Sequence, residues 1–203
     1  ADSKNKNSKK ILISIKSQIL NKNKPGKIYK TFVKTKKLFN IKDREIIDLI
    51  NGLLIDKGKV EFMTEKELIR YSYHVAGCVG LMMCPILGCK ERLAKSFAID
   101  LGIAMQLTNI ARDIKEDANM NRRYLPGNWI DFLSPKDIIK CSNDPNSKNY
   151  KKIQKGINKI LLLAEKYYKS GNAGLVYLPF KSHLSIAVAS KIYRQIGKKI
   201  INN

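Results

Sequence analysis

The 203 residues are enough for one domain with a hydrophobic core, and 44% hydrophobic residues with only 6 prolines exclude a disordered chain. The formal net charge of +22 ordinarily raises nucleic acid as a partner. However, the lysines are spread along the chain, and no nucleic-acid motif or basic–aromatic pattern is present. We therefore expect no nucleic-acid partner, and anionic lipid headgroups or diphosphate groups suit this charge better.

Apolar residues recur with helical spacing along most of the chain. Thr64 and Glu67 form a capping box that begins a helix, whereas Pro25, Gly26 and Gly58 mark breaks. No segment shows the alternation of a strand, so the predicted fold class is all-α. The pattern predicts helices over residues 11–20, 28–39, 41–55, 65–83, 91–118, 153–170 and 182–201, a short helix within 129–139, and loops over 140–152 and 171–179.

The cysteines show no CxxC spacing and no histidines at metal-ligand distance in the sequence. Three of the four lie in an apolar stretch, where a thiol behaves as a small hydrophobe. They are Cys78, Cys84, Cys89 and Cys141. The N-terminal residues lack the apolar region of a signal peptide, and the longest uncharged run, 75–89, is shorter than the roughly 20 residues that span a bilayer. These features favour a cytoplasmic location with reduced thiols.

The segment Leu101–Pro126 is the most informative part of the chain. On a helix that continues to about Ala118, it separates into two faces. The apolar face carries Ile103, Leu107, Ile110 and Ile114, and the polar face carries Gln106, Asn109, Asp113 and Asp117. Two carboxylates one turn apart beside a cavity can hold Mg²⁺, which prefers oxygen ligands and is commonly shared with substrate phosphates.

The same spacing also occurs on ordinary surface helices, where two such aspartates are solvated charges. Against that interpretation, the polar face contains amides and acids but none of the lysines that are frequent elsewhere. It therefore has the composition of a cavity wall. Arg112, Arg122 and Arg123 bracket the acids and have the geometry to hold phosphate oxygens bidentately.

Two stretches resemble motifs of one enzyme family. QLTNIARDIKEDANMNRRYLP (106–126) resembles the second aspartate-rich motif of the squalene and phytoene synthase family, and YSYHVAGCVGLMM (71–83) is similar to its tyrosine-containing helix. The resemblance extends faintly through almost the whole chain, and the combination of the two motifs is specific. It implies an isoprenoid synthase-type helical bundle around a central cavity. Residues 1–203 would be a single domain, incomplete at the N-terminus and also at the C-terminus.

The resemblance implies roles for individual residues. Asp113 and Asp117 would hold Mg²⁺, with Mn²⁺ as a substitute, while Arg112 and Arg122 would grip the leaving diphosphate. Tyr71 would assist ionisation or take part in proton transfer, although a core tyrosine with a satisfied hydroxyl is the structural alternative. Gln106 and Asn109 would orient the ligands or the diphosphate. Val75, Val79, Met83, Leu101, Gly102 and Met105 would line the tunnel for the prenyl tails.

Two further features depend on the resemblance. The chain begins Ala1-Asp2-Ser3, which is similar to the end of the family's first aspartate-rich motif, so Asp2 would be its last acid and a third metal ligand. An unrelated start is the alternative. Gly77 and Gly80 leave a notch in one helix, which serves either close helix packing or the prenyl tail; His74, where relatives often have tyrosine, is interpreted as packing.

The implied reaction is the head-to-head condensation of two prenyl diphosphates, with geranylgeranyl diphosphate converted to phytoene in carotenoid biosynthesis. One alternative is a squalene or dehydrosqualene synthase that uses farnesyl diphosphate, and the squalene reaction would also need NADPH. Another is a non-catalytic assembly protein of the same fold, against which the retained acids and Tyr71 argue. We expect peripheral association with the inner membrane face, and the sequence does not indicate an oligomeric state.

Overall fold

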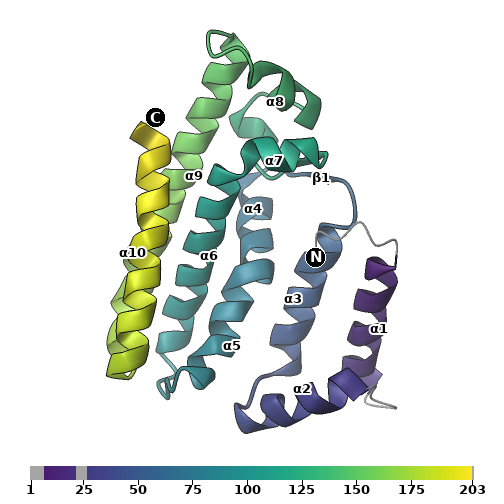
Figure 1. The fold of residues 1–203 in the computed structure, drawn as a ribbon, viewed down its shortest axis with the longest axis vertical. Coiled ribbons are helices and arrows are strands. Elements are labelled where there is room, and N and C mark those ends of the chain that lie inside the picture. Colours follow the sequence, from purple (N-terminus) through teal and green to yellow (C-terminus); the bar gives the residue numbers. More distant parts are fainter. Residues whose placement is uncertain (1–6, 22–26, 203) are drawn as a thin grey trace.

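The computed structural model describes residues 7–21 and 27–202, and Figure 1 shows that they form an almost entirely helical array. The predicted all-α class is confirmed. The α-helices are α1 Ser8–Asn21, α2 Lys27–Leu38, α3 Asp43–Ile55, α4 Glu65–Ser72, α5 Cys78–Ile86, α6 Ala94–Arg112, α7 Ile114–Asn119, α8 Pro135–Cys141, α9 Lys148–Ala173 and α10 Phe180–Asn202. Shorter helical turns are the π-helical η1 Tyr73–Gly77 and the 3₁₀ turns η2 Gly127–Trp129 and η3 Gly174–Tyr177.

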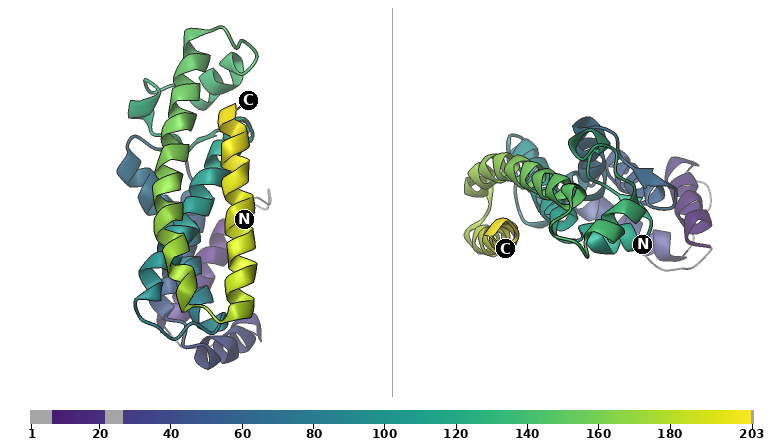
Figure 2. Two further views of the ribbon diagram at one scale, coloured as in Figure 1. Left: turned by 90° about the vertical axis from the view of Figure 1, so that its left-hand side faces the viewer. Right: turned by 90° about the horizontal axis from the view of Figure 1, so that it is seen from above.

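Helix α6 is at the centre of the array. It packs most extensively against α9, and also against η1, α5 and α10. Figures 1 and 2 show α10 and α1 at opposite edges, with α7 and α8 at one end of the array. The main hydrophobic core surrounds α6, whereas a second, smaller core joins α1 to α3 through Ile19, Ile46 and Ile50. No helix within residues 7–21 and 27–202 is long and apolar enough to cross a membrane.

Helices α5 and α6 approach each other closely because glycines face backbone atoms at the contact. A Cβ on Gly80 would lie 2.2 Å from the carbonyl oxygen of Ala98, and a Cβ on Gly102 would lie 2.4 Å from that of Ala76. Any side chain at these positions would push the helices apart. The notch at Gly80 therefore serves helix packing, and Gly80 also lines an apolar cavity, so its role in accommodating a prenyl tail stays a prediction.

Two short strands are an exception to the expectation that the chain contains helices alone. β1 (Val60–Glu61) pairs in parallel with β2 (Arg122–Arg123), and Val60 lies opposite Arg122. Two residues are too few to produce a recognisable alternation, so the sequence pattern gave no sign of this pairing. It fixes the segment after α7 against the connection between α3 and α4.

The long predicted helix 91–118 differs from the structure. It begins at Ala94 and is interrupted at Asp113, whose backbone angles of φ −100° and ψ 13° are not helical. Asp113 still makes a helical hydrogen bond on each side, from Asp113 N to Asn109 O at 2.9 Å and from Asp117 N to Asp113 O at 2.8 Å. Asp113 therefore closes α6 and opens α7 at a bend in the chain.

Two other predictions of helix boundaries were also wrong. The predicted helix 65–83 contains the π-helical turn η1, in which Cys78 N donates to Tyr73 O, five residues earlier. Helix α9 begins inside the predicted loop 140–152 because the Ser147 hydroxyl accepts a hydrogen bond from Tyr150 N and caps the helix. It ends at Ala173, and η3 continues the helical path through the predicted break.

Candidate active site

The polar face predicted around α6 and α7 exists in the folded chain. Gln106, Asn109, Asp113 and Asp117 are all partly exposed. On the adjacent face, Ile103, Leu107 and Ile110 are buried, with Leu107 at 0% exposure. The predicted orientation of this helix is therefore confirmed, and its polar side chains border solvent-accessible space.

The first acid of this face, Asp113, forms an ion pair with its neighbour Arg112. Arg112 Nε donates to Asp113 Oδ1 at 2.6 Å, and Arg112 Nη2 donates to Asp113 Oδ2 at 2.7 Å. This bidentate bond raises the pKa of Arg112 above its ordinary value. To bind a diphosphate as predicted, the Arg112 guanidinium would have to release Asp113 or contact Asp113 and the diphosphate at the same time.

One buried oxygen on the same face lacks a partner in the described part of the chain. No donor there lies within hydrogen-bonding distance of Asn109 Oδ1, one turn before Asp113. An uncompensated amide oxygen beside two carboxylates matches the ligands that Mg²⁺ prefers. The described residues contain no cluster of three or more His, Cys, Asp and Glu side chains that could hold a metal. Asp2, the predicted third acid, lies outside the described residues.

Tyr71 belongs to a buried aromatic cluster. Its ring stacks on Tyr124 with centroids 4.9 Å apart and lies 5.3 Å from Phe62. The Tyr71 hydroxyl donates to both carboxylate oxygens of Asp56, at 2.9 and 3.0 Å, and the Tyr124 hydroxyl donates to Asp56 Oδ1 at 2.8 Å. The hydroxyl of Tyr71 is thus satisfied, as the structural alternative requires.

Burial is the main cause that raises the pKa values of Tyr71 and Tyr124 far above the ordinary value, and the nearby charge of Asp56 adds to it. Both phenols therefore remain protonated at neutral pH and act as hydrogen-bond donors. This environment disfavours Tyr71 as a phenolate base and, because a raised pKa also makes the phenol a weaker acid, as a proton donor, whereas a role as an orienting group is compatible with it.

The β1–β2 pairing connects this aromatic cluster with the second acid motif. Arg122 Nη2 donates to the carbonyl oxygen of Asp56 at 3.1 Å. Asp117, Arg122 and Tyr124 line a common small cleft. Tyr71 is therefore connected to the acid motif by its hydrogen bond to Asp56 and its stacking on Tyr124.

Arg123 does not face phosphate-binding space, contrary to the expectation for the three bracketing arginines. It is 2% exposed, and its Nη1 donates to the carbonyl oxygens of Phe62 and Leu125 at 2.6 and 2.7 Å. Burial lowers its pKa, and Glu61 lies 3.9 Å from its Nη2. Arg123 thus stabilises the backbone around β2.

Sequence reasoning missed two carboxylates. Asp56 directly follows α3, and a single acid after a helix carries no recognisable signal. Asp48 on α3 accepts a hydrogen bond from the Tyr73 hydroxyl at 3.0 Å and lies 3.8 Å from His74 Nδ1. The Tyr-rich run 71–74 was the available sign, because clustered phenols that become buried need acceptors.

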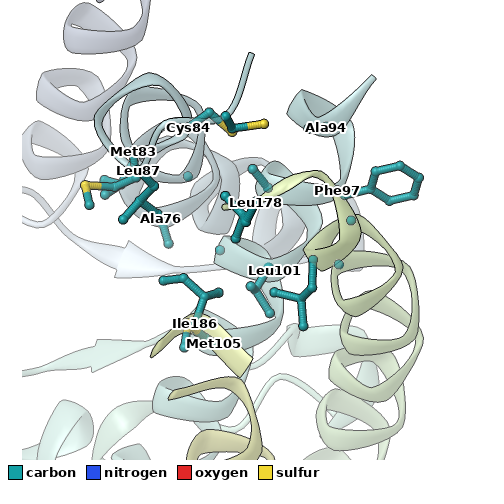
Figure 3. Close-up of a pocket in the computed structure, with 18 of the residues that line it drawn as sticks. Ala76, Met83, Cys84, Leu87, Ala94, Phe97, Leu101, Met105, Leu178 and Ile186 are labelled. Atoms are coloured by element: carbon teal, nitrogen blue, oxygen red, sulfur yellow. The ribbon is translucent and has the colours of Figure 1, made fainter. Parts of the chain in front are cut away.

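A largely apolar cavity of about 280 Å³ lies between α5, α6, η3 and α10. Figure 3 shows Met83, Leu87, Phe97, Leu101, Leu178 and Ile186 around this space. All six residues predicted to line a prenyl tunnel are in its wall: Val75, Val79, Met83, Leu101, Gly102 and Met105. Gln106 and Asn109 are not among the lining residues, so they belong to the polar face alone. The role of this cavity in binding prenyl tails stays a prediction.

Comparison with known proteins agrees with these features. The squalene/phytoene synthase family profile matches residues 11–203. The 15-cis-phytoene synthase of Enterobacter agglomerans is 40% identical over 154 residues, which cover 76% of this chain and 51% of the relative. That of Paracoccus sp. is 41% identical over 154 residues, covering 76% and 48%. The chain thus spans about half the length of the curated relatives it matches.

Two solved structures share the fold. The squalene synthase HpnC from Alicyclobacillus acidocaldarius superposes with a TM-score of 0.76 at 18% identity, over 96% of this chain and 71% of that one. A dehydrosqualene synthase in complex with ligand gives a TM-score of 0.78 at 24% identity, over 98% and 71%. The expected isoprenoid synthase-type helical fold is therefore confirmed.

Proposed function

Because the chain belongs to the squalene/phytoene synthase family, we propose that it takes part in the head-to-head condensation of two prenyl diphosphates. The proposed substrate is geranylgeranyl diphosphate, and the proposed product is phytoene, an early compound of carotenoid biosynthesis. The similar curated relatives are named phytoene synthases, which supports this choice of substrate.

One observation carries the proposal: helix α6 borders an apolar cavity and leads directly into the acid motif. Leu101, Gly102 and Met105 of α6 line the cavity, and Asp113 directly follows the last residue of the same helix. A prenyl diphosphate has this division, with a long apolar tail and a multiply charged head. The cavity would hold the tail, and the polar face would hold the head.

At the polar face, Asp113, Asp117 and the amide oxygen of Asn109 are the residues that would hold Mg²⁺ or Mn²⁺. The bound cation would offset the charge that develops on the departing diphosphate. Arg122, fixed to the backbone of Asp56, would contact the diphosphate oxygens from the adjacent segment. Arg112 would exchange Asp113 for the diphosphate when the substrate binds.

The aromatic cluster would keep two protonated phenols beside the reacting centre. Asp56 accepts hydrogen bonds from both Tyr71 and Tyr124, which orients the two hydroxyl groups. A phenol would donate a hydrogen bond to the leaving group only after its hydroxyl turned away from Asp56. The cavity, lined almost entirely by apolar side chains, would exclude the water that converts an allylic cation into an alcohol.

A second candidate is the C15 reaction of a squalene or dehydrosqualene synthase. The two structural neighbours described above carry those names, which favours it, although both are below 25% identity. NADPH would be required only for squalene. A cytoplasmic location at the inner membrane face stays a prediction that rests on the net charge of +22.

The proposal is tested by incubating the chain, extended to the length of its relatives, with radiolabelled geranylgeranyl or farnesyl diphosphate and Mg²⁺ and identifying the products by mass spectrometry; residues 1–203 alone are expected to give no product. Phytoene from the C20 substrate alone is the expected result. Squalene or dehydrosqualene from the C15 substrate would favour the second candidate. Tight binding of both substrates without any product, in a chain extended to the length of its relatives, would favour the non-catalytic alternative.

A further inference from the structure

Helix α5 ends in a glycine turn that brings two cysteines together. Gly88 has a φ of +82°, the left-handed conformation that glycine adopts at helix ends. Gly88 N donates to Pro85 O at 3.2 Å, and Cys89 N donates to Cys84 O at 2.9 Å. This pair of hydrogen bonds defines a Schellman motif, in which the side chains of the first and last residues commonly touch. Here those residues are Cys84 and Cys89.

The two thiols of this turn are close neighbours. The Cys84 thiol is buried, and burial first, and then the neighbouring Cys89 thiol, raises the pKa of Cys84 to about 11. Cys89 is partly exposed. A disulfide requires Cα atoms no more than about 7 Å apart, and a direct backbone hydrogen bond between the two residues keeps them within that range.

The turn forms part of the wall of the apolar cavity. Both Cys84 and Cys89 line it, and Figure 3 shows Cys84 beside the cavity with Met83 and Leu87. The Ser182 hydroxyl donates to Leu87 O at 2.9 Å, which joins the turn to the first turn of α10. A covalent change in this turn would therefore alter one end of the cavity.

We propose that Cys84 and Cys89 are a reversible dithiol–disulfide site. The more exposed Cys89 attacks one sulfur of glutathione disulfide as a thiolate and releases one glutathione. The Cys84 thiol then loses its proton to solvent, and its sulfur displaces the second glutathione from Cys89. The protein loses two hydrogens and two electrons and gains one S–S bond, while glutathione disulfide is reduced to two glutathione molecules.

The other two cysteines are internal controls because they have no thiol beside them. Cys78 is 0% exposed and its Sγ donates to His74 O at 2.8 Å. Cys141 is 5% exposed and its Sγ contacts Ile138 O at 3.4 Å. Neither should react with glutathione disulfide while the chain is folded.

The test is incubation of the folded 203-residue chain with glutathione disulfide, followed by alkylation of free thiols and peptide mass spectrometry. We expect one intramolecular disulfide between Cys84 and Cys89 that dithiothreitol reverses. In the Cys84→Ser variant, the glutathione adduct at Cys89 should accumulate instead. In the Cys89→Ser variant, the buried Cys84 should remain alkylatable only after unfolding.

Gly88→Ala tests the turn itself, because a side chain at this φ is strained and its Cβ would lie 3.1 Å from Pro179 Cγ. Disulfide formation should be at least about tenfold slower than in the unchanged chain, since the thiols lose their alignment. Circular dichroism shows whether the Gly88→Ala variant folds. If it does not fold, the products of the Cys84→Ser and Cys89→Ser variants test the proposal instead. A stable adduct at Cys89 in the unchanged chain, or no reaction at all, would overturn the proposal.

Discussion

The two ends of the central region formed by α6 and α7 are built in different ways. At the cavity end, α5 and α6 pack so closely that glycines face backbone carbonyl groups, and the wall is almost entirely apolar. At the acid end, charged groups are held by specific partners, such as Asp113 by Arg112 and Asp56 by two tyrosines. Close packing thus maintains the structure of the cavity end, and charged hydrogen bonds maintain that of the acid end. Substitutions should therefore affect the two ends differently.

The largest expected effect is unfolding of the chain, which would destroy both the cavity end and the acid end. Leu107→Asp places a charge at a position with 0% exposure between the two ends of α6. An unpaired buried carboxylate should destabilise the fold by about 4 kcal/mol or more. Thermal unfolding followed by circular dichroism measures the loss. Lys95→Asp, at an exposed position on the same helix, should leave the melting temperature almost unchanged; equal losses would contradict the assigned orientation of α6.

The cavity end should be more sensitive to added volume than to lost charge. Gly102→Ala inserts a Cβ that would lie 2.4 Å from the Ala76 carbonyl oxygen, so α5 and α6 must separate. We expect a loss of about 2–3 kcal/mol in the free energy of unfolding, measured by urea titration. Gly58→Ala is the matched control, because its added Cβ meets nothing closer than 3.6 Å. A Gly102→Ala protein as stable as the control would show that this contact tolerates expansion.

The acid end should show the opposite behaviour, with function lost and folding kept. Asp113→Asn keeps the shape but removes the charge and the bidentate bond with Arg112. In the chain extended to the length of its relatives, turnover of geranylgeranyl diphosphate should fall at least about 100-fold, equivalent to about 2.7 kcal/mol. The free energy of unfolding should fall by less than about 1 kcal/mol, because the pair is near the surface. Undiminished turnover, or unchanged Mg²⁺ binding by calorimetry, would contradict the assigned role.

The smallest expected effect concerns the buried phenols. Tyr71→Phe removes one donor to Asp56 and should cost about 1–2 kcal/mol at neutral pH. The pKa of Tyr71 is raised on folding, so its contribution is complete below the unfolded value of about 10 and is lost as pH rises beyond it. Above that pH, the stability of the unchanged chain should fall more steeply than that of the variant, by about 1.4 kcal/mol per pH unit. Parallel curves in urea titrations at pH 9, 10 and 11 would contradict this.

The difference between the two ends also explains what could be predicted from the sequence. Helical spacing predicted the buried face of α6 and the polar face, because these depend on local periodicity, whereas the six proposed cavity residues came from the family resemblance. The contacts around Asp56 could not be predicted from spacing, since they depend on a two-residue pairing between segments about 60 residues apart. The burial of Arg123 and the stacking of Tyr71 on Tyr124 depend on the same β1–β2 pairing. The bend at Asp113 was missed because the apolar spacing of Leu107, Ile110 and Ile114 continues across it.

The π-helical turn η1 determines how the side chains of α5 are rotated about the helix axis relative to those of α4. It contributes one extra residue to a turn, between Tyr71 on α4 and the cavity residues Val79 and Met83 on α5. Each residue of an α-helix turns the chain by about 100°. A regular α-helix with the same number of residues would therefore rotate α5 by about that angle relative to α4. Val79 and Met83 would then face away from the cavity while Tyr71 still reached Asp56, so the wide turn of η1 absorbs one residue and keeps the two surfaces in register.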